Sequence, residues 1–269
     1  MEPEQLRSVV EIARAAGKKT LEFYGGDIGL ERKADDSPLT LADKASHELI
    51  DMALRELDAD IPVLSEESSE EAVRDRRSWQ RFWCVDPLDG TKEFVKETGQ
   101  FTVNIALVEG DEVTLGVVHV PVTGVTYSAL RGGGAWVDRG DGELREIRTR
   151  KVDLDRPVIV ASRDHAGPKV AALLARLPNA HATSMGSSLK FCLVAEGAAD
   201  FYPRLVPTFE WDTAAAQCIL ETAGGGIVDL RGERLKYNKD DLRNPSLLSF
   251  GDRSVDWVEF MAPELVEAT

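Results

Sequence analysis

Two segments near the start of the chain carry apolar residues at the spacing of a helix. In residues 4–24 apolar side chains return every three or four positions, and Gly25 and Gly26 follow directly. Residues 40–57 repeat the pattern, with one apolar and one charged face. Both segments therefore predict amphipathic helices packed against a core, and the glycine pair marks the end of the first helix.

Shorter apolar runs follow after residue 60. Residues 61–68 (IPVLSEES) and 81–90 (RFWCVDPLDG) are apolar until they end in acidic side chains, which predicts two strands, the second of them buried. Residues 101–137 are rich in β-branched residues and are broken by three glycine-containing turn sequences. This composition predicts an antiparallel meander.

Strand-like and helix-like segments alternate in the second half of the chain. Strands are expected at 157–161, 180–184 and 199–202, and helices at 167–176, 187–196 and 212–223. A polar segment, 140–155, separates them from the meander. The pattern indicates a mixed α+β or layered α/β architecture. We expect one compact unit with an N-terminal half, 1–145, and a C-terminal half, 146–269.

The composition is that of a folded protein with an acidic surface. Of the 269 residues 43% are hydrophobic and 29% charged, which is sufficient for a large core. The formal net charge of -15 argues against nucleic-acid duplexes or anionic lipid as main partners. No apolar run reaches the roughly 20 residues of a membrane-spanning helix, and the N-terminus lacks a secretory signal pattern.

The cysteines indicate a reducing compartment. Cys84, Cys192 and Cys218 lie far apart, each within an apolar segment. Such spacing is typical of reduced core thiols, so we expect a cytoplasmic protein; attachment to the inner membrane surface is the alternative.

The segment WCVDPLDGTKEF, residues 83–94, places two carboxylates at the end of an apolar run. Asp86 and Asp89 would repel each other unless turn amides or a cation compensate them. Mg²⁺ prefers oxygen ligands, and Pro87 would stiffen the turn so that the Leu88 carbonyl becomes a further ligand. Gly90 allows close backbone approach, and the amides after it would bind a phosphate at a helix start.

Two further acidic positions end or begin predicted elements. Glu66 and Glu67 end the strand VLSEES, although such pairs are commonly only solvated. Asp212 opens the apolar helix of FEWDTAAAQ, where an aspartate also serves as an ordinary N-cap. Three acidic element ends beside one phosphate-binding turn favour a metal and phosphate site over these separate explanations.

These motifs resemble a known superfamily. DPLDGTKEF together with WDTAAA is similar to the lithium-sensitive, magnesium-dependent sugar phosphatases, which include inositol monophosphatase and fructose-1,6-bisphosphatase. LSEES, GTKEFVKETGQFTVNIALVEG, GSSLKFCLVAEGAADFYPR and EWDTAAAQCILETAGG resemble its 3'(2'),5'-bisphosphate nucleotidase branch, the CysQ type. The resemblance covers about residues 5 to 250 and implies a layered α-β-α-β-α sandwich.

The resemblance implies an activity. It predicts Mg²⁺-dependent hydrolysis of the 3'-phosphate of 3'-phosphoadenosine 5'-phosphate to AMP and phosphate, in sulfate assimilation. Superfamily members are often dimers, which implies a homodimer. Inositol-1-phosphate or a range of sugar phosphates is the alternative substrate class. A non-catalytic nucleotide- or metal-binding module is disfavoured because the family's acidic residues are all present.

The resemblance also implies roles for individual residues. Two or three Mg²⁺ ions would be held by the side chains of Glu66, Asp86, Asp89 and Asp212 and by the Leu88 carbonyl, with Glu67 nearby. Asp43 and Thr91, with Glu66, would orient the attacking water, so no protein nucleophile is needed. The amides of Gly90 and Thr91 would bind the phosphate, which also lies against Asp89 and Asp212.

Substrate contacts are predicted from the second half of the chain. Lys190 and Arg204 would meet a second phosphate, or else are surface cations. Ser187 and Ser188 would contact the nucleoside, or else cap the helix that follows them. In the first case Gly186 would allow the ligand to approach closely.

Overall fold

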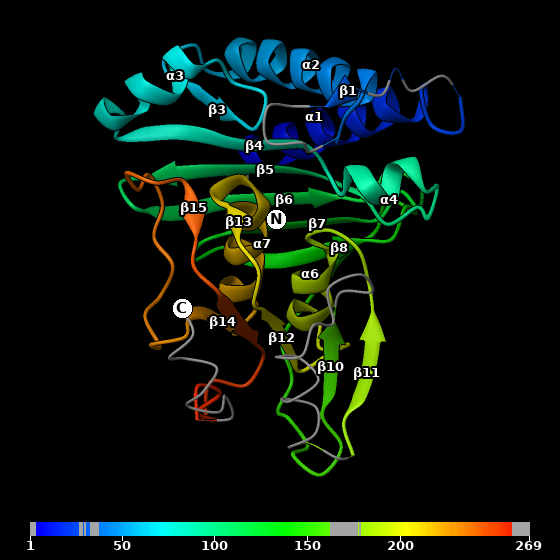
Figure 1. The fold of residues 1–269 in the computed structure, drawn as a ribbon, viewed down its shortest axis with the longest axis vertical. Coiled ribbons are helices and arrows are strands. Elements are labelled where there is room, and N and C mark those ends of the chain that lie inside the picture. The colour runs from blue at the N-terminus through cyan, green and yellow to red at the C-terminus, as the bar shows by residue number, and fades with distance from the viewer. Residues whose placement is uncertain are drawn as a thin grey trace.

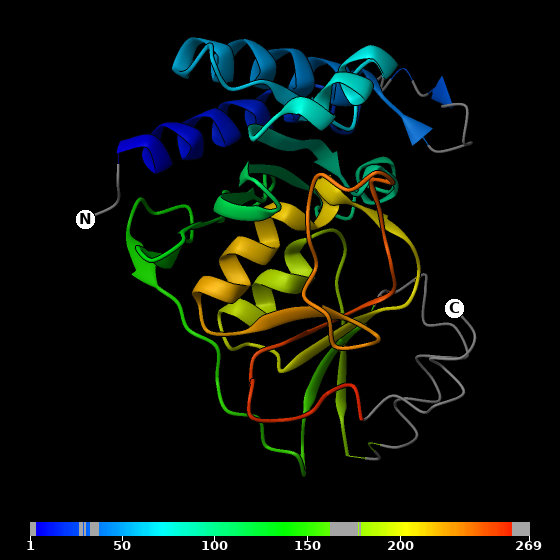
Figure 2. The ribbon, with the colours of Figure 1, turned by 90° about the vertical axis from the view of Figure 1, so that its left-hand side faces the viewer.

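The computed structural model describes residues 4–26, 29, 31–32, 38–161, 177 and 179–259. Helices α1 (Glu4–Leu21) and α2 (Leu41–Leu57) lie on one face of a seven-stranded sheet (Figure 1). Helices α6 (Leu189–Ala195) and α7 (Glu210–Thr222) lie between this sheet and a five-stranded one (Figure 2). The described residues thus form α, β, α and β layers in turn.

The seven-stranded sheet contains the expected meander. Its strands run in chain order: β3 (Val63–Ser65), β4 (Arg81–Asp89), β5 (Thr102–Glu109), β6 (Glu112–His119), β7 (Thr126–Leu130), β8 (Gly134–Asp138) and β9 (Leu144–Glu146). Only the β3–β4 pair is parallel. Alternate residues of β4 pack on opposite faces: Trp83 belongs to the cluster with α1 and α2, and Phe82 and Cys84 to the cluster with α6 and α7. A sheet covered by helices on both faces explains why its strands are almost continuously apolar.

The five-stranded sheet is mixed. Its spatial order is β11 (His181–Ser184), β10 (Val158–Ala161), β12 (Phe201–Arg204), β16 (Leu247–Phe250) and β14 (Gly226–Asp229). Strand β10 is parallel to both neighbours, whereas β16 is antiparallel to β12 and β14. The pattern of apolar residues predicted β10, β11 and β12 but missed β14 and β16. The helix expected at 167–176 lies outside the described residues.

Short elements complete the described chain. They are α3 (Glu70–Asp75), a 3₁₀ helix at Arg76–Ser78, α4 (Thr91–Val95), and the two-stranded pairs β1 (Glu31–Arg32) with β2 (Pro38–Leu39) and β13 (Thr208–Phe209) with β15 (Arg243–Asn244). The predicted helix 40–57 begins one residue later because Thr40 is its N-cap, with an extended backbone. The predicted helix 187–196 begins at Leu189, because Ser187 has a φ of 49°.

Helix α7 packs very closely on the large sheet. A Cβ atom at Gly116 of β6 would overlap the main-chain oxygen of Ala215 in α7, so only glycine fits there. This contact brings the first turn of α7 over the ends of β4 and β5. The three cysteines are buried free thiols, as expected, and burial raises the pKa of each. Among the described residues no helix is long and apolar enough to cross a membrane.

Candidate active site

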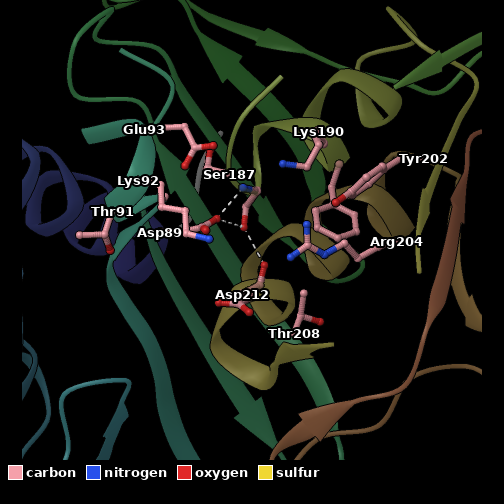
Figure 3. Close-up of a pocket in the computed structure, with 13 residues that line it drawn as sticks. Asp89, Thr91, Lys92, Glu93, Ser187, Lys190, Tyr202, Arg204, Thr208 and Asp212 are labelled. Atoms are coloured by element: carbon pink, nitrogen blue, oxygen red, sulfur yellow. Dashed lines mark hydrogen bonds between the residues drawn. The ribbon is translucent and has the colours of Figure 1, made fainter. Parts of the chain in front are cut away.

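Three carboxylates from two distant parts of the chain converge at the end of strand β4. Oxygen atoms of Asp86, Asp89 and Asp212 all lie within 4.8 Å of one another. Asp86 and Asp89 belong to β4, and Asp212 lies in the first turn of α7. Figure 3 shows the Asp89 and Asp212 side chains facing a common pocket. The structure therefore brings together three of the four side chains that the sequence suggested as metal ligands.

The end of β4 is held in an irregular conformation. The pairing with β5 shifts register between Asp86 and Asp89. The Leu88 amide donates to Asp86 Oδ1 at 3.0 Å, and Ser46 of α2 donates to the Pro87 carbonyl at 2.8 Å. A turn amide thus does bond Asp86, as the simpler explanation proposed, but this bond does not explain why three carboxylates lie within 4.8 Å of one another.

The pKa values of the cluster reflect burial and mutual repulsion of its carboxylates. Burial, then the charges of Glu66, Asp89 and Asp212, raise the pKa of Asp86 well above its usual range. Burial, then the charges of Asp89 and Glu66, raise the pKa of Asp212 to about 8. In the described part of the chain no lysine or arginine forms an ion pair with these three carboxylates. Three hard oxygen donors this close together, whose mutual repulsion a cation would relieve, fit a divalent ion.

Glu66 lies close enough to the cluster for its charge to act on two of these carboxylates, but it is not one of the three converging residues. Its main-chain amide donates to the Val85 carbonyl of the neighbouring strand at 3.1 Å, which fixes it beside the end of β4. Glu67 follows it, and its amide donates to Ser65 Oγ.

Asp43 and Thr91 meet across the site. Asp43 is buried at the start of α2, where its Oδ2 accepts from the amide and the hydroxyl of Thr40 at 2.8 and 2.5 Å. Its Oδ1 lies 3.5 Å from the Thr91 hydroxyl at the start of α4. Asp43 is therefore a buried carboxylate that the N-cap Thr40 holds beside Thr91.

A pocket adjoins the carboxylates. It is lined by Asp89, Gly90, Thr91, Lys92, Glu93, Ser187, Ser188, Lys190, Phe191, Tyr202, Arg204, Thr208 and Asp212 (Figure 3). Gly90 has a φ of 95°, which only glycine adopts easily, and α4 begins directly after it. Most of the residues predicted to contact substrate therefore line one pocket.

Two cations face the carboxylates across this pocket (Figure 3). Lys190 is only 5% exposed, and its Nζ lies 3.4 Å from the Met185 carbonyl and 5.5 Å from the centre of the Tyr202 ring. Burial lowers the pKa of Lys190 to about 8, although Asp89 opposes this. The Nε of Arg204 is buried without a hydrogen-bond partner among the described residues. Lys190 is thus not a surface cation, and both side chains have unused capacity to bind an anion.

The GSS segment holds Asp89. The amide and hydroxyl of Ser188 lie 2.5 and 2.6 Å from Asp89 Oδ2, and the hydroxyl also lies 2.6 Å from the main-chain oxygen of Asp212. Ser188 makes no side-chain capping bond to α6, while Ser187 Oγ accepts from the Leu189 amide at 3.4 Å. The Ser188 hydroxyl therefore links two of the three carboxylate-bearing residues.

Gly186 packs closely against another residue of the chain, Gln100. Its amide donates to Gln100 Oε1 at 3.0 Å, and a Cβ atom there would lie 2.5 Å from the Gln100 main-chain oxygen. This contact alone accounts for a glycine, and its predicted contact with a ligand stays a prediction.

Sequence reasoning missed two polar residues of β5. Asn104 Nδ2 lies 3.0 Å from Ser188 Oγ and 3.4 Å from Asp89 Oδ2, and the Thr102 hydroxyl lies 3.5 Å from the same oxygen. Both are buried. The signal was present, because a threonine and an asparagine interrupt the otherwise apolar strand TVNIALV.

Known proteins resemble the chain over most of its length. The sequence profile of the inositol monophosphatase family matches residues 2–255. The 3'(2'),5'-bisphosphate nucleotidase CysQ of Salmonella typhimurium is 47% identical over 243 residues, which cover 89% of this chain and 97% of that protein. CysQ of Escherichia coli K12 is 46% identical with the same coverage. The crystal structure of CysQ from Bacteroides thetaiotaomicron has a TM-score of 0.80 at 39% identity and covers 93% of this chain and 97% of its own.

Proposed function

The chain belongs to the inositol monophosphatase family, and we propose that it hydrolyses the 3'-phosphate of 3'-phosphoadenosine 5'-phosphate, giving AMP and phosphate. The family is generally metal-dependent, and the relatives that match most of the chain are named 3'(2'),5'-bisphosphate nucleotidases. A role in sulfate assimilation accompanies this activity. The alternative of a non-catalytic binding module has no observation in its favour.

One observation carries the proposal: Asp89 and Asp212, two of the three converging carboxylates, line a pocket whose opposite wall holds Lys190 and Arg204. A substrate with two phosphates suits such a pocket. The reacting phosphate would lie at the carboxylates, where bound metal ions would compensate the negative charge of the phosphate and of the carboxylates. The other phosphate would lie at the lysine and arginine. An inositol monophosphate has no second phosphate for these two cations.

We propose Mg²⁺ as the metal, held by Asp86, Asp89 and Asp212 with Glu66 and the Leu88 carbonyl. Bound there, it would supply Lewis-acid activation of water and charge neutralisation of the phosphate. The protein's own contribution is orientation. The Asp43 carboxylate accepts a hydrogen bond from the Thr91 hydroxyl, which leaves the lone pairs of the threonine oxygen to accept a hydrogen bond from the attacking water. The amides of Gly90 and Thr91 bind the phosphate oxygens, and Lys190 and Arg204 hold the substrate in line.

The test is phosphate release by the purified protein with Mg²⁺. It compares 3'-phosphoadenosine 5'-phosphate, inositol-1-phosphate and fructose-1,6-bisphosphate, each with and without a chelator. We expect kcat/KM for the nucleotide to be at least about a hundredfold higher, roughly 2.7 kcal/mol of transition-state preference. A preference for inositol phosphate would overturn the substrate assignment and leave the proposed metal site intact. Phosphate release that persists in the chelator would overturn the proposed metal dependence.

We also propose a cytoplasmic homodimer in which residues 1–145 and 146–269 act as two halves of one unit. Light scattering of the purified protein during gel filtration tests the dimer. A single cooperative unfolding transition, seen equally by fluorescence and circular dichroism, tests the single unit.

A further inference from the structure

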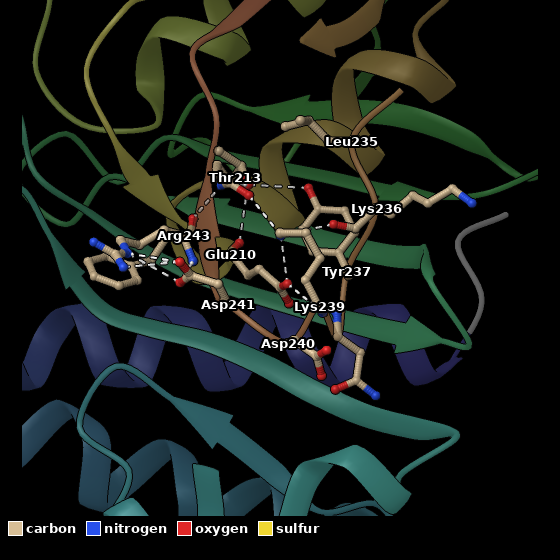
Figure 4. Close-up of polar contacts among 12 residues, drawn as sticks. Glu210, Thr213, Leu235, Lys236, Tyr237, Lys239, Asp240, Asp241 and Arg243 are labelled. Carbon is tan, nitrogen blue, oxygen red and sulfur yellow. Dashed lines mark hydrogen bonds and ion pairs between the residues drawn. The ribbon is translucent and has the colours of Figure 1, made fainter. Parts of the chain in front are cut away.

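A further buried carboxylate lies at the start of α7, close in sequence to the carboxylate cluster. Glu210 begins α7 two residues before Asp212 and is 0% exposed. Its Oε2 accepts from the Asn238 amide at 2.8 Å, and its Oε1 accepts from the Lys239 amide at 3.0 Å and from Lys239 Nζ at 2.7 Å (Figure 4). Two consecutive residues of another segment thus donate hydrogen bonds to both oxygens of this buried carboxylate.

Residues 236–244, which we name the clamp loop, contact the start of α7 at several more points. The Glu210 amide donates to the Leu242 carbonyl at 3.0 Å. Asn244 Nδ2 lies 2.7 Å from the Phe209 carbonyl and 3.0 Å from the Thr213 hydroxyl. Asn244 Oδ1 in turn accepts from Lys239 Nζ at 3.1 Å, so the ion pair and the amide contacts form one network.

The clamp loop is itself anchored on both sides. The Tyr237 hydroxyl donates to Gln217 Oε1 at 2.8 Å, one turn further along α7. The guanidinium of Arg76, which is buried, donates to the carbonyls of Lys239 and Asp240 at 2.7 and 3.0 Å. A loop held in this way cannot shift without breaking several buried hydrogen bonds at once.

The network reaches Asp212 through the main chain of Phe209. The Phe209 amide donates to Asp212 Oδ2 at 2.8 Å, and the Phe209 carbonyl is the group that Asn244 holds. Asp212 needs such support, because its carboxylate lies within 4.8 Å of the oxygens of Asp86 and Asp89, and like charges this close repel one another. A buried ion pair is rarely worth more to stability than apolar residues of the same size, and its best-attested use is to enforce one geometry.

We propose that the clamp loop, through the Glu210–Lys239 ion pair, is a positioning element that holds the Asp212 carboxylate toward Asp86 and Asp89 for the cation. The inference rests on the proposed function, because it takes Asp212 as a metal ligand. Neither Glu210 nor Lys239 lines the pocket, so both act through Asp212 and not on the substrate.

The experiment breaks the pair and compares it with matched controls. Glu210→Gln and Lys239→Met remove one charge each. Glu221→Gln breaks a comparable pair at the other end of α7, where Glu221 Oε2 lies 2.8 Å from Arg234. Lys236→Met removes an exposed cation of the same loop, whose Nζ lies 3.1 Å from Asp111. Mg²⁺ Kd is measured by titration calorimetry, alongside Tm and phosphate release as a function of Mg²⁺.

We expect Glu210→Gln and Lys239→Met to raise the Mg²⁺ Kd about tenfold, the usual effect of losing a residue that orients a ligand. Saturating Mg²⁺ should restore most of kcat, and Lys239→Arg, which keeps the charge, should restore much of the affinity. Glu221→Gln and Lys236→Met should leave Kd unchanged, even where Glu221→Gln lowers Tm.

Wild-type Kd in Glu210→Gln and Lys239→Met, or equal weakening in Glu221→Gln, would overturn the inference and leave the proposed function intact. If Glu210→Gln does not fold, the comparison of Mg²⁺ Kd between Lys239→Met and its control Lys236→Met tests the inference without it. No Mg²⁺-dependent release by the wild type from any of the three substrates would overturn the proposed function, and the inference with it.

Discussion

At the scale of single residues, Asp89 shows how the protein prepares a carboxylate. Ser188, Asn104 and Thr102 place their donors on the same oxygen, Oδ2. Among the described residues none of these bonds goes to Oδ1, which is therefore available to a cation. The hydrogen bonds to Oδ2 orient the carboxylate, and Oδ1 remains available to bind a cation.

The first prediction concerns this charge. Asp89→Asn keeps the shape of the side chain but removes its negative charge, so Mg²⁺-dependent phosphate release should fall by more than the roughly 10- to 100-fold that loss of a group supporting a metal ligand costs. The variant should keep the wild-type circular dichroism spectrum, because the Ser188 amide can still bond an amide oxygen. Asp141→Asn, which alters an exposed aspartate, is the control and should stay active. An active Asp89→Asn enzyme would remove Asp89 from the site.

The second prediction concerns the two cations of the pocket. Arg204→Ala should lower kcat/KM for 3'-phosphoadenosine 5'-phosphate by about 10- to 100-fold, the usual value of a hydrogen bond to a charged group. Hydrolysis of adenosine 3'-monophosphate, which lacks the second phosphate, should change far less. An equal loss on both substrates would show that Arg204 does not bind the second phosphate. Lys190→Met should behave like Arg204→Ala.

At the scale of elements, a buried histidine at the end of β6 lies where α1 packs on the large sheet. His119 lies against Gly17 of α1, and its Nδ1 lies 2.9 Å from the Thr126 hydroxyl of β7. Burial, and next the charge of Arg14, lower the pKa of His119 from 6.5 to about 4. Between these values the unfolded chain binds a proton at this residue that the folded chain does not.

The third prediction follows from that difference. The stability that neutral His119 provides is complete above pH 6.5 and is lost as the pH falls toward 4. The wild type should therefore lose at most about 3 kcal/mol of unfolding free energy over this range from His119 alone. Urea unfolding of wild type and His119→Gln at several pH values isolates this loss. A difference between the two proteins that is independent of pH would contradict it.

At the scale of the whole molecule, the proposed cation would join the large sheet to the helix layer between the two sheets. Asp86 and Asp89 come from the seven-stranded sheet, while Asp212 comes from the helix between the sheets. A cation bound to all three would stabilise the folded state only, since the unfolded chain does not bring these residues together.

The fourth prediction is a rise in Tm with Mg²⁺. At about a hundred times the Kd, binding should add about 2.7 kcal/mol to the free energy of unfolding. Calorimetric melting with Mg²⁺, and with NaCl at equal ionic strength, measures the effect. Asp89→Asn should show no such rise. An equal rise in NaCl would indicate charge screening of the acidic protein and no specific site.

Much of this molecule was predictable from the sequence, because many of its elements have a local sequence pattern that reflects how they are buried. Helices α1 and α2 follow from apolar periodicity, because each has one face buried in a core, whereas β3, β4 and the meander follow from short apolar or β-branched runs between turns, because their strands are buried on both faces. The acidic residues and their motifs identified the family and its reaction. Strands β14 and β16 were missed because their few apolar residues show no period distinct from that of a loop.

What only the tertiary structure decided is which distant residues meet. Side-chain type and local spacing are written in the chain, so Asp86, Asp89 and Asp212 could be singled out one by one. Their convergence depends on α7 packing against Gly116 of the sheet, and the link from Ser188 to Asp89 and the clamp on Glu210 depend on loops that return from elsewhere. Local sequence determines an element and its faces, whereas contacts between elements arise from packing, which no single segment encodes.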